Sequence, residues 1–160
     1  MKIGVLADSH DNMPKIEAAV EIFARYSVEH VLHAGDFVAP FAIDPLRALG
    51  CRMLAVFGNN DGERLGLAAR IRDFGEVHDY LATATLGGRR IAIVHYPELA
   101  EPLSRSGDFD LVVYGHTHKV DYHKDDTLLL NPGEVGGWLS GISTVAIVEL
   151  ETLEVEILEV

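Results

Sequence analysis

Aspartate, histidine and asparagine residues recur in this sequence directly after apolar runs, in five separate loops. In chain order these loops are Asp8-Ser9-His10, Gly35-Asp36, Gly58-Asn59-Asn60-Asp61, His95 and Gly115-His116-Thr117-His118. Carboxylate and amide oxygens and imidazole nitrogens are ligands of divalent metals. Because each loop follows what resembles a buried strand, the pattern predicts a dinuclear metal hydrolase.

Taken one at a time, most of these loops have an ordinary structural explanation. Aspartate, the residue at position 8, is common directly before helices, and Gly35-Asp36 is typical of a turn. His95, alone at a strand end, is more often a structural residue. The 115–118 loop is the strongest single signal, because two imidazoles flank one residue after a buried strand. Convergence of all five loops at one edge of a sheet favours a shared site.

The spacing of these residues suggests how their side chains meet. Asp8 and His10 are two residues apart, so on an extended backbone both would point to one side and reach one ion. Gly115 is expected to let the chain turn so that the two following imidazoles face the site. Asp36 has two carboxylate oxygens and could bridge two metals. Asp61 could orient a neighbouring ligand.

A parallel sheet with covering helices would position the loops. Strands are predicted at 2–7, 28–33 and 52–57, alternating with helices that begin after an Asn12 cap and at 41–49 and 63–72. Hairpins are predicted at 81–86 with 89–94 and at 120–123 with 127–130, together with a helix at 99–104, a strand at 111–114 and a C-terminal antiparallel pair. We therefore expect an α/β architecture of two packed mixed sheets with helices outside.

Length and composition restrict the possible functions. The 160 residues favour one domain over 1–160, and the net charge of −12 without any Lys/Arg cluster argues against strong nucleic-acid binding. The sequence contains no apolar run of membrane-spanning length. Cys51 is the only cysteine and cannot form an internal disulfide, so a cytoplasmic location is expected.

In this order, Asp-x-His, Gly-Asp, Gly-Asn-x-Asp, a strand-end His and Gly-His-Thr-His resemble the calcineurin-like metallophosphoesterase superfamily. The chain is most similar in size to its small bacterial and archaeal phosphodiesterase branch, which includes a relative in the retromer coat. The similarity runs from Lys2 to the Asn131-Pro132-Gly133 turn. It implies a four-layer α/β/β/α sandwich and hydrolysis of phosphodiesters by a metal-bridging hydroxide.

The resemblance also implies which residues hold two divalent ions, chosen from Mn, Fe, Zn, Ni or Co with Mn favoured. One ion would be held by Asp8, His10, Asp36 and His118, and the other by Asp36, Asn59, His95 and His116. Asp36 would bridge the pair. The residues expected to take part in catalysis are Asp36, Asn60, Asp61 and His95.

Three positions depart from the family pattern. Asn60 stands where larger phosphatases have a histidine thought to assist the leaving group, so we expect good rates only on esters with acidic leaving groups. Tyr96 replaces a common glycine and could narrow the pocket or stack on an aryl or base group. Glu134 replaces a small residue and, if it points inward, would disfavour highly charged substrates.

Two rival functions are compatible with parts of the sequence. The first is a non-catalytic scaffold, as in the retromer relative, but all seven expected ligand positions are chemically competent here. The second is a structural zinc protein, although such sites favour cysteine and close spacing. The expected partner is a small-molecule phosphate ester, with no membrane. No pattern in the sequence indicates or excludes a homo-oligomer.

Overall fold

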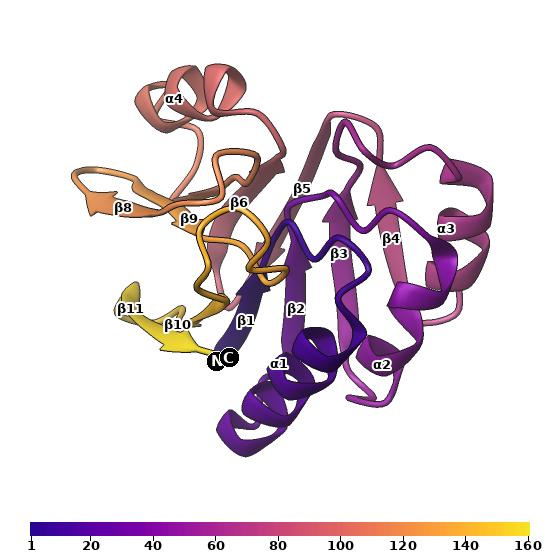
Figure 1. Ribbon diagram of the computed structural model, residues 1–160. Helices are drawn as coiled ribbons and strands as arrows, with labels where there is room; N and C mark the ends of the chain where they lie inside the picture. The colour runs from indigo at the N-terminus through magenta and orange to yellow at the C-terminus, as the bar shows by residue number, and fades with distance from the viewer.

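The computed structural model describes residues 1–160 and arranges eleven strands in two sheets. The first sheet has the order β11-β10-β1-β2-β3-β4, and the second has the order β5-β6-β7-β9-β8 (Figure 1). The strands of the first sheet are β1 (Lys2–Leu6), β2 (His30–His33), β3 (Arg52–Val56), β4 (Gly75–His78), β10 (Thr144–Glu149) and β11 (Glu154–Glu159). Those of the second are β5 (Leu81–Leu86), β6 (Arg89–Val94), β7 (Leu111–Val113), β8 (Val120–Lys124) and β9 (Leu128–Pro132).

Both sheets are mixed, as expected. Strands β1 to β4 run parallel, whereas β10 pairs antiparallel with both β1 and β11. In the second sheet β6, β7 and β9 run parallel, and the edge strands β5 and β8 are antiparallel to their neighbours. The parallel strands place their carboxyl ends, and therefore their following loops, at a common edge.

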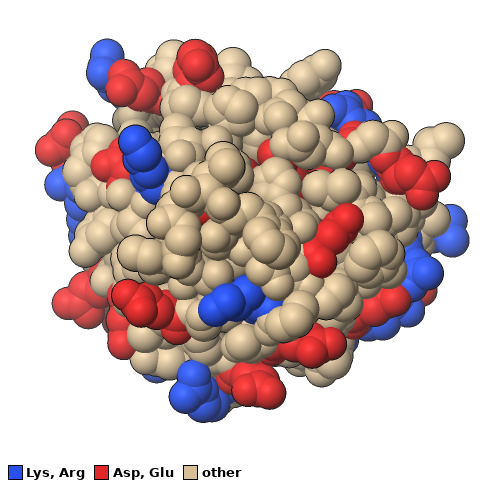
Figure 2. Space-filling view, viewed as in Figure 1, with Lys and Arg blue, Asp and Glu red and all other residues tan.

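Helices cover the outer faces. They are α1 (Met13–Tyr26), the 3₁₀ turn η1 (Pro40–Ile43), α2 (Asp44–Arg47), α3 (Arg64–Ile71) and α4 (Pro97–Arg105). None of these helices combines the length and apolar character needed to cross a bilayer. The face shown in Figure 2 has acidic and basic side chains interspersed around its margins, with no basic cluster.

Three apolar clusters separate the layers. One lies between the first sheet and the helices and includes Phe23 of α1 and Leu6 of β1. A second lies between the sheets and includes Ile3 and Val5 of β1, so this strand alternates between two cores. A third, smaller cluster, which includes Ala100 of α4, lies under that helix. The expected four-layer arrangement is therefore confirmed.

Local differences from the expected elements have physical causes. The Asn12 side chain makes no cap to α1, because its amide donates instead to the Gly136 carbonyl at 2.7 Å. The expected helix at 41–49 is divided into η1 and α2, where Pro45 lacks an amide proton to continue the preceding turn. The edge strand β4 was not expected, because its four residues carry little apolar signal.

Close packing of α1 on β1 predicts a stability defect for Gly4→Ala. A Cβ at Gly4 would lie 2.8 Å from two ring carbons of Phe23, which is fully buried. Overpacking of this kind costs roughly 1–3 kcal/mol. We expect a lower urea midpoint for Gly4→Ala, with Gly62→Ala as a matched control, because a Cβ at Gly62 would have no atom within 4 Å. Equal midpoints for the two variants would contradict this packing.

Candidate metal centre

The five predicted loops meet at the carboxyl-end edge of the two sheets. Backbone hydrogen bonds join them: Asp8 N donates to Gly35 O at 3.0 Å, and Gly115 N donates to His95 O at 3.1 Å. The amide of His116 donates to the Asp8 carboxylate at 3.0 and 3.3 Å, which links the two sheets. Side chains more than 100 residues apart in the sequence are therefore neighbours.

Four of the expected ligands form one tight group. Ligand atoms of Asp8, His10, Asp36 and His118 all lie within 4.8 Å of one another. His10 Nε2 is 3.5 Å from Asp36 Oδ2, and His118 Nε2 is 3.5 Å from Asp8 Oδ1. His10 Nε2 is buried and has no hydrogen-bond partner. An unpartnered nitrogen facing carboxylates is the environment that a bound cation would satisfy.

A second group surrounds His95. Its Nδ1 donates to Ala34 O at 2.7 Å, so Nε2 carries a lone pair in the neutral ring. That nitrogen faces Asn59 Oδ1 at 3.0 Å and Asp36 Oδ2 at 3.6 Å. Three acceptors therefore face one another without a proton between them. This arrangement also fits a cation.

Asp36 lies between the two groups. Its Oδ2 is almost equally far from His10 Nε2 and His95 Nε2, at 3.5 and 3.6 Å. Asn60 donates to both of its carboxylate oxygens, from the backbone and from the side-chain amide, each at 2.8 Å. The side chain of Asn60 thus contacts Asp36, a contact that sequence reasoning did not anticipate.

His116 is the most exposed of the expected ligands together with Asn59. Its ring centroid lies 5.0 Å from that of His95 and 5.1 Å from that of Tyr96, in edge-on contacts. The Tyr96 ring also packs edge-on against His95 at 5.0 Å. The structure therefore places His116 and Tyr96 beside the second group.

The backbone brings the ligands together in a different way from the one expected. Asp8 and His10 have φ values of 52° and 42°, so they meet through left-handed turns and not through the alternation of an extended strand. Asp36, His116 and His118 also have positive φ, at 60°, 69° and 59°. Non-glycine residues in this region carry strain, which the surrounding hydrogen bonds must offset.

Gly115 also acts differently from the expectation. Its φ is not positive, and the turn is made by the histidines themselves. A Cβ at this position would lie 2.9 Å from Asp8 Oδ2 and 3.0 Å from Ala7 Cβ. Glycine is needed because the two sheets approach closely here.

Two buried side chains, which are not in the tight ligand group, hold the loops by hydrogen bonds. The Asp61 carboxylate accepts backbone amides of Asp36, Val38 and Gly58 at 2.7–3.0 Å, so it fixes the loop that carries Asp36. His33 is not among the expected site residues. Its Nε2 lies 3.3 Å from Ser9 Oγ, and its Nδ1 accepts the Gly35 amide at 3.1 Å. The signal for His33 in the sequence was only its proximity to Asp36.

The Glu134 carboxylate points inward, but it contacts an expected ligand and backbone amides. Glu134 is fully buried, and its carboxylate accepts His118 Nδ1 at 2.9 Å together with three backbone amides. Burial alone would raise its pKa, but the Ser140 and His118 hydrogen bonds lower the pKa to about 2. A charged carboxylate held in this way does not contact the substrate.

The electrostatics of the site favour a cation. Asp8 and Asp36 are at most 1% exposed, and no lysine or arginine nitrogen lies within 4.0 Å of either carboxylate. Burial and then repulsion from Asp36 raise the pKa of Asp8 to about 8. Burial also lowers the pKa values of His10 and His95, which keeps their imidazoles neutral and able to coordinate.

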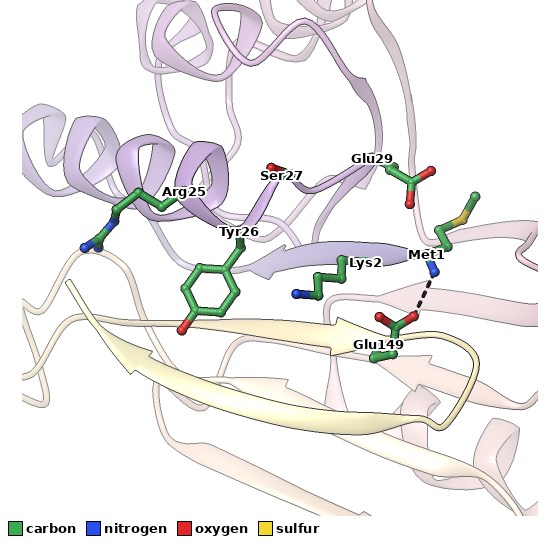
Figure 3. Close-up of a pocket in the computed structure, with 7 residues that line it drawn as sticks. All are labelled: Met1, Lys2, Arg25, Tyr26, Ser27, Glu29 and Glu149. Atoms are coloured by element: carbon green, nitrogen blue, oxygen red, sulfur yellow. Dashed lines mark hydrogen bonds and ion pairs between the residues drawn. The ribbon is translucent and has the colours of Figure 1, made fainter.

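A hollow elsewhere on the surface offers no comparable chemistry. It has a volume of about 610 Å³ and lies by the start of β1 (Figure 3), whereas the first site loop follows the end of that strand. The N-terminal ammonium crosses it to Glu149 Oε1 at 2.8 Å. None of the expected site residues lines it.

Known proteins are similar to this chain in sequence, in fold or in both. A phosphodiesterase of Methanocaldococcus jannaschii is 40% identical over 159 residues, which cover 96% of each chain. A solved archaeal phosphodiesterase superposes with a TM-score of 0.94 at 37% identity over all of both chains. Vps29 of Entamoeba histolytica, solved with Zn²⁺, has a TM-score of 0.70 at 20% identity over 100% of this chain and 98% of its own, which shows a common fold.

The family comparison agrees with the geometry. The calcineurin-like phosphoesterase superfamily domain matches residues 1–153, nearly the whole chain and every loop of the candidate site. With the fold, the convergent ligand loops and this match in place, the chain belongs to the calcineurin-like phosphoesterase superfamily.

Proposed function

We propose that this protein is a phosphodiesterase that holds two divalent metal ions, with manganese favoured. The observation that carries the proposal is the Asp36 carboxylate between two bare imidazole nitrogens, those of His10 and His95. The 40% identical phosphodiesterase supports the choice of diesters as substrates. We further propose that residues 1–160 act as one cytoplasmic domain on a small-molecule ester.

The residues would divide the work between two ions. The first ion would be held by Asp8, His10, Asp36 and His118, and the second by Asp36, Asn59, His95 and His116. When bound, such a pair activates water for attack on phosphorus and neutralises charge that builds on the phosphoryl oxygens. Asp61 keeps the bridging carboxylate in place through its hold on the loop backbone.

Leaving-group chemistry follows from Asn60. Its amide donates to Asp36 and, having no titratable proton near neutral pH, cannot act as a general acid. The leaving group must then depart largely unprotonated. We therefore propose aryl phosphodiesters and other esters with acidic leaving groups as the better substrates.

Tyr96 supplies an aromatic wall beside the second ion. Its ring packs against both His95 and His116, which fixes its position next to two expected ligands. An aryl or base substituent of a diester could stack on a ring held in this place.

A non-catalytic scaffold for protein–protein interaction is the alternative function. The 40% identical relative is named a phosphodiesterase, and all seven expected ligand positions carry residues able to coordinate a metal, so catalysis is favoured over a scaffold role. Metal analysis together with an aryl diester assay on one sample separates the two functions.

Replacing the shared carboxylate should remove metal and activity together. We expect Asp36→Ala to lose metal from both groups and to reduce diester hydrolysis by more than about 100-fold, because ligand loss should exceed the effect of losing a supporting partner. Asp126→Ala, in the exposed β8–β9 turn, is the matched control. Two ions per chain retained in Asp36→Ala would disprove bridging.

Introducing a proton donor at Asn60 should broaden the substrate range. We expect Asn60→His to raise turnover on alkyl esters by about 10-fold or more, with less effect on aryl esters, because general acids assist poor leaving groups most. The measurement is the slope of log kcat/KM against leaving-group pKa. Identical slopes in the wild type and the variant would contradict a leaving-group role for this position.

The raised pKa of Asp8 predicts a pH dependence. In the metal-free protein the folded state holds a proton between pH 4 and about 8 that the unfolded chain has released, so the free energy of unfolding falls as the pH rises through this window. Metal must displace that proton, so affinity should rise by up to about tenfold per pH unit until pH 8.

Calorimetry in buffers of different ionisation enthalpy counts the protons released on metal binding. We expect a release near one from Asp8 at pH 7, and none in Asp8→Asn. A wild-type affinity that does not change between pH 6.5 and 8 would show that Asp8 is already ionised.

A further inference from the structure

Glu134 is a buried carboxylate to which the proposed reaction gives no role. It follows the Pro132-Gly133 turn at the end of β9 and is 0% exposed. The next residue, Val135, donates its amide to Ala7 O at 3.0 Å, directly before the first ligand loop. The backbone therefore fixes Glu134 at the rear of the metal centre.

The carboxylate of Glu134 is surrounded by donors. Oε2 accepts His118 Nδ1 at 2.9 Å and the Trp138 amide at 3.1 Å. Oε1 accepts the amides of Leu139 at 3.1 Å and Ser140 at 2.5 Å. No lysine or arginine nitrogen lies within 4.0 Å, so hydrogen bonds alone hold this group.

One of these donors is an expected metal ligand. Because Glu134 only accepts, the His118 hydrogen must reside on Nδ1, which leaves the lone pair on Nε2. That nitrogen lies 3.5 Å from Asp8 Oδ1, inside the first ligand group. The carboxylate thus selects the tautomer that coordinates through Nε2.

The other donors belong to the loop that joins β9 to β10, gold in Figure 1. In this loop the Trp138 amide donates to the Glu134 carboxylate, and its indole N–H donates to His10 O at 3.2 Å. Its side chain is 65% exposed although both of these groups are bonded. Glu134 therefore contacts both a ligand imidazole and the segment that carries an exposed aromatic ring beside a second ligand.

We propose that Glu134 is a positioning residue that fixes His118 as an Nε2 ligand and holds the Trp138 loop against the metal centre. The inference rests on the proposed metal site and deepens it. It makes occupancy of the first ion and the environment of Trp138 depend on one carboxylate. The conservative change Glu134→Gln tests it, because an amide NH₂ would face backbone donors.

The first measurement is Zn²⁺ binding by calorimetry. We expect Glu134→Gln to weaken one of the two sites by about 10–100-fold, the usual effect of losing a partner of a ligand histidine. Glu21→Gln, an equal charge change on the exposed face of α1, should bind as the wild type does. Wild-type affinity in a folded Glu134→Gln protein would overturn the proposal.

A double-mutant cycle separates positioning from a general structural defect. If Glu134 acts through His118, Glu134→Gln should weaken Zn²⁺ binding in the wild type but have no further effect in His118→Ala. An equal loss in both backgrounds would overturn the proposal. Trp138 is the only tryptophan, so its fluorescence reports the loop directly. We expect a Zn²⁺-dependent emission change that Glu134→Gln abolishes.

Nitrogen-15 NMR of the metal-free wild type tests the contact without any variant. We expect the Nδ1–H tautomer for His118 at neutral pH, and an Nε2–H tautomer would overturn the proposal even if Glu134→Gln did not fold. This result is independent of catalysis. If the wild type binds no metal, the proposed function fails, whereas the role of Glu134 in setting the tautomer is still tested.

Discussion

Two buried carboxyl groups without a neighbouring lysine or arginine are the constraint on which this structure depends. Asp8 and Asp36 lie in the interior of the loop cluster, and the nearest basic groups are imidazoles whose pKa values burial lowers, as at His10 and His95. Isolated carboxylates are costly to bury. A divalent cation resolves the conflict, because it neutralises the carboxylates and accepts the imidazole lone pairs.

The backbone around the site is strained, and hydrogen bonds between the loops hold it. Left-handed φ values at five ligand positions are unfavourable for non-glycine residues, yet each is held by hydrogen bonds from neighbouring loops. Asp61 holds the Asp36 loop by accepting three backbone amides. The absence of a side chain at Gly115 lets the two sheets approach closely. These hydrogen bonds, and not the strain, keep the expected ligand atoms close together.

The supporting residues differ between the two ligand groups. His95 donates to a neutral carbonyl, that of Ala34, whereas His118 donates to the charged Glu134. A hydrogen bond to a charged carboxylate is stronger than one to a neutral carbonyl and fixes the ring tautomer more firmly. The two ligand groups are therefore supported unequally, and the one that contains His118 is also connected to the Trp138 loop through Glu134.

The residue pattern alone was enough to predict the two mixed sheets, most helices and the meeting of the five ligand loops. Periodicity carries this information, because apolar runs mark buried strands and parallel strands must end at one edge. The edge strand β4 was not predicted, because its four residues alternate with exposed polar side chains and bury little apolar surface. The division at Pro45 depends on a single missing amide, which no periodicity reports.

Only the tertiary structure decided how the expected ligands come together and which residues hydrogen-bond to them. The sequence placed Asp8 and His10 on one side by strand alternation, but left-handed turns bring them together. It gave no direction for Glu134, whose carboxylate turns inward to His118, or for Asn60, whose amide turns to Asp36. Residue types and spacing determine which groups are available. Which of them share a hydrogen bond depends on contacts between distant segments, and these exist only when the sheets are packed.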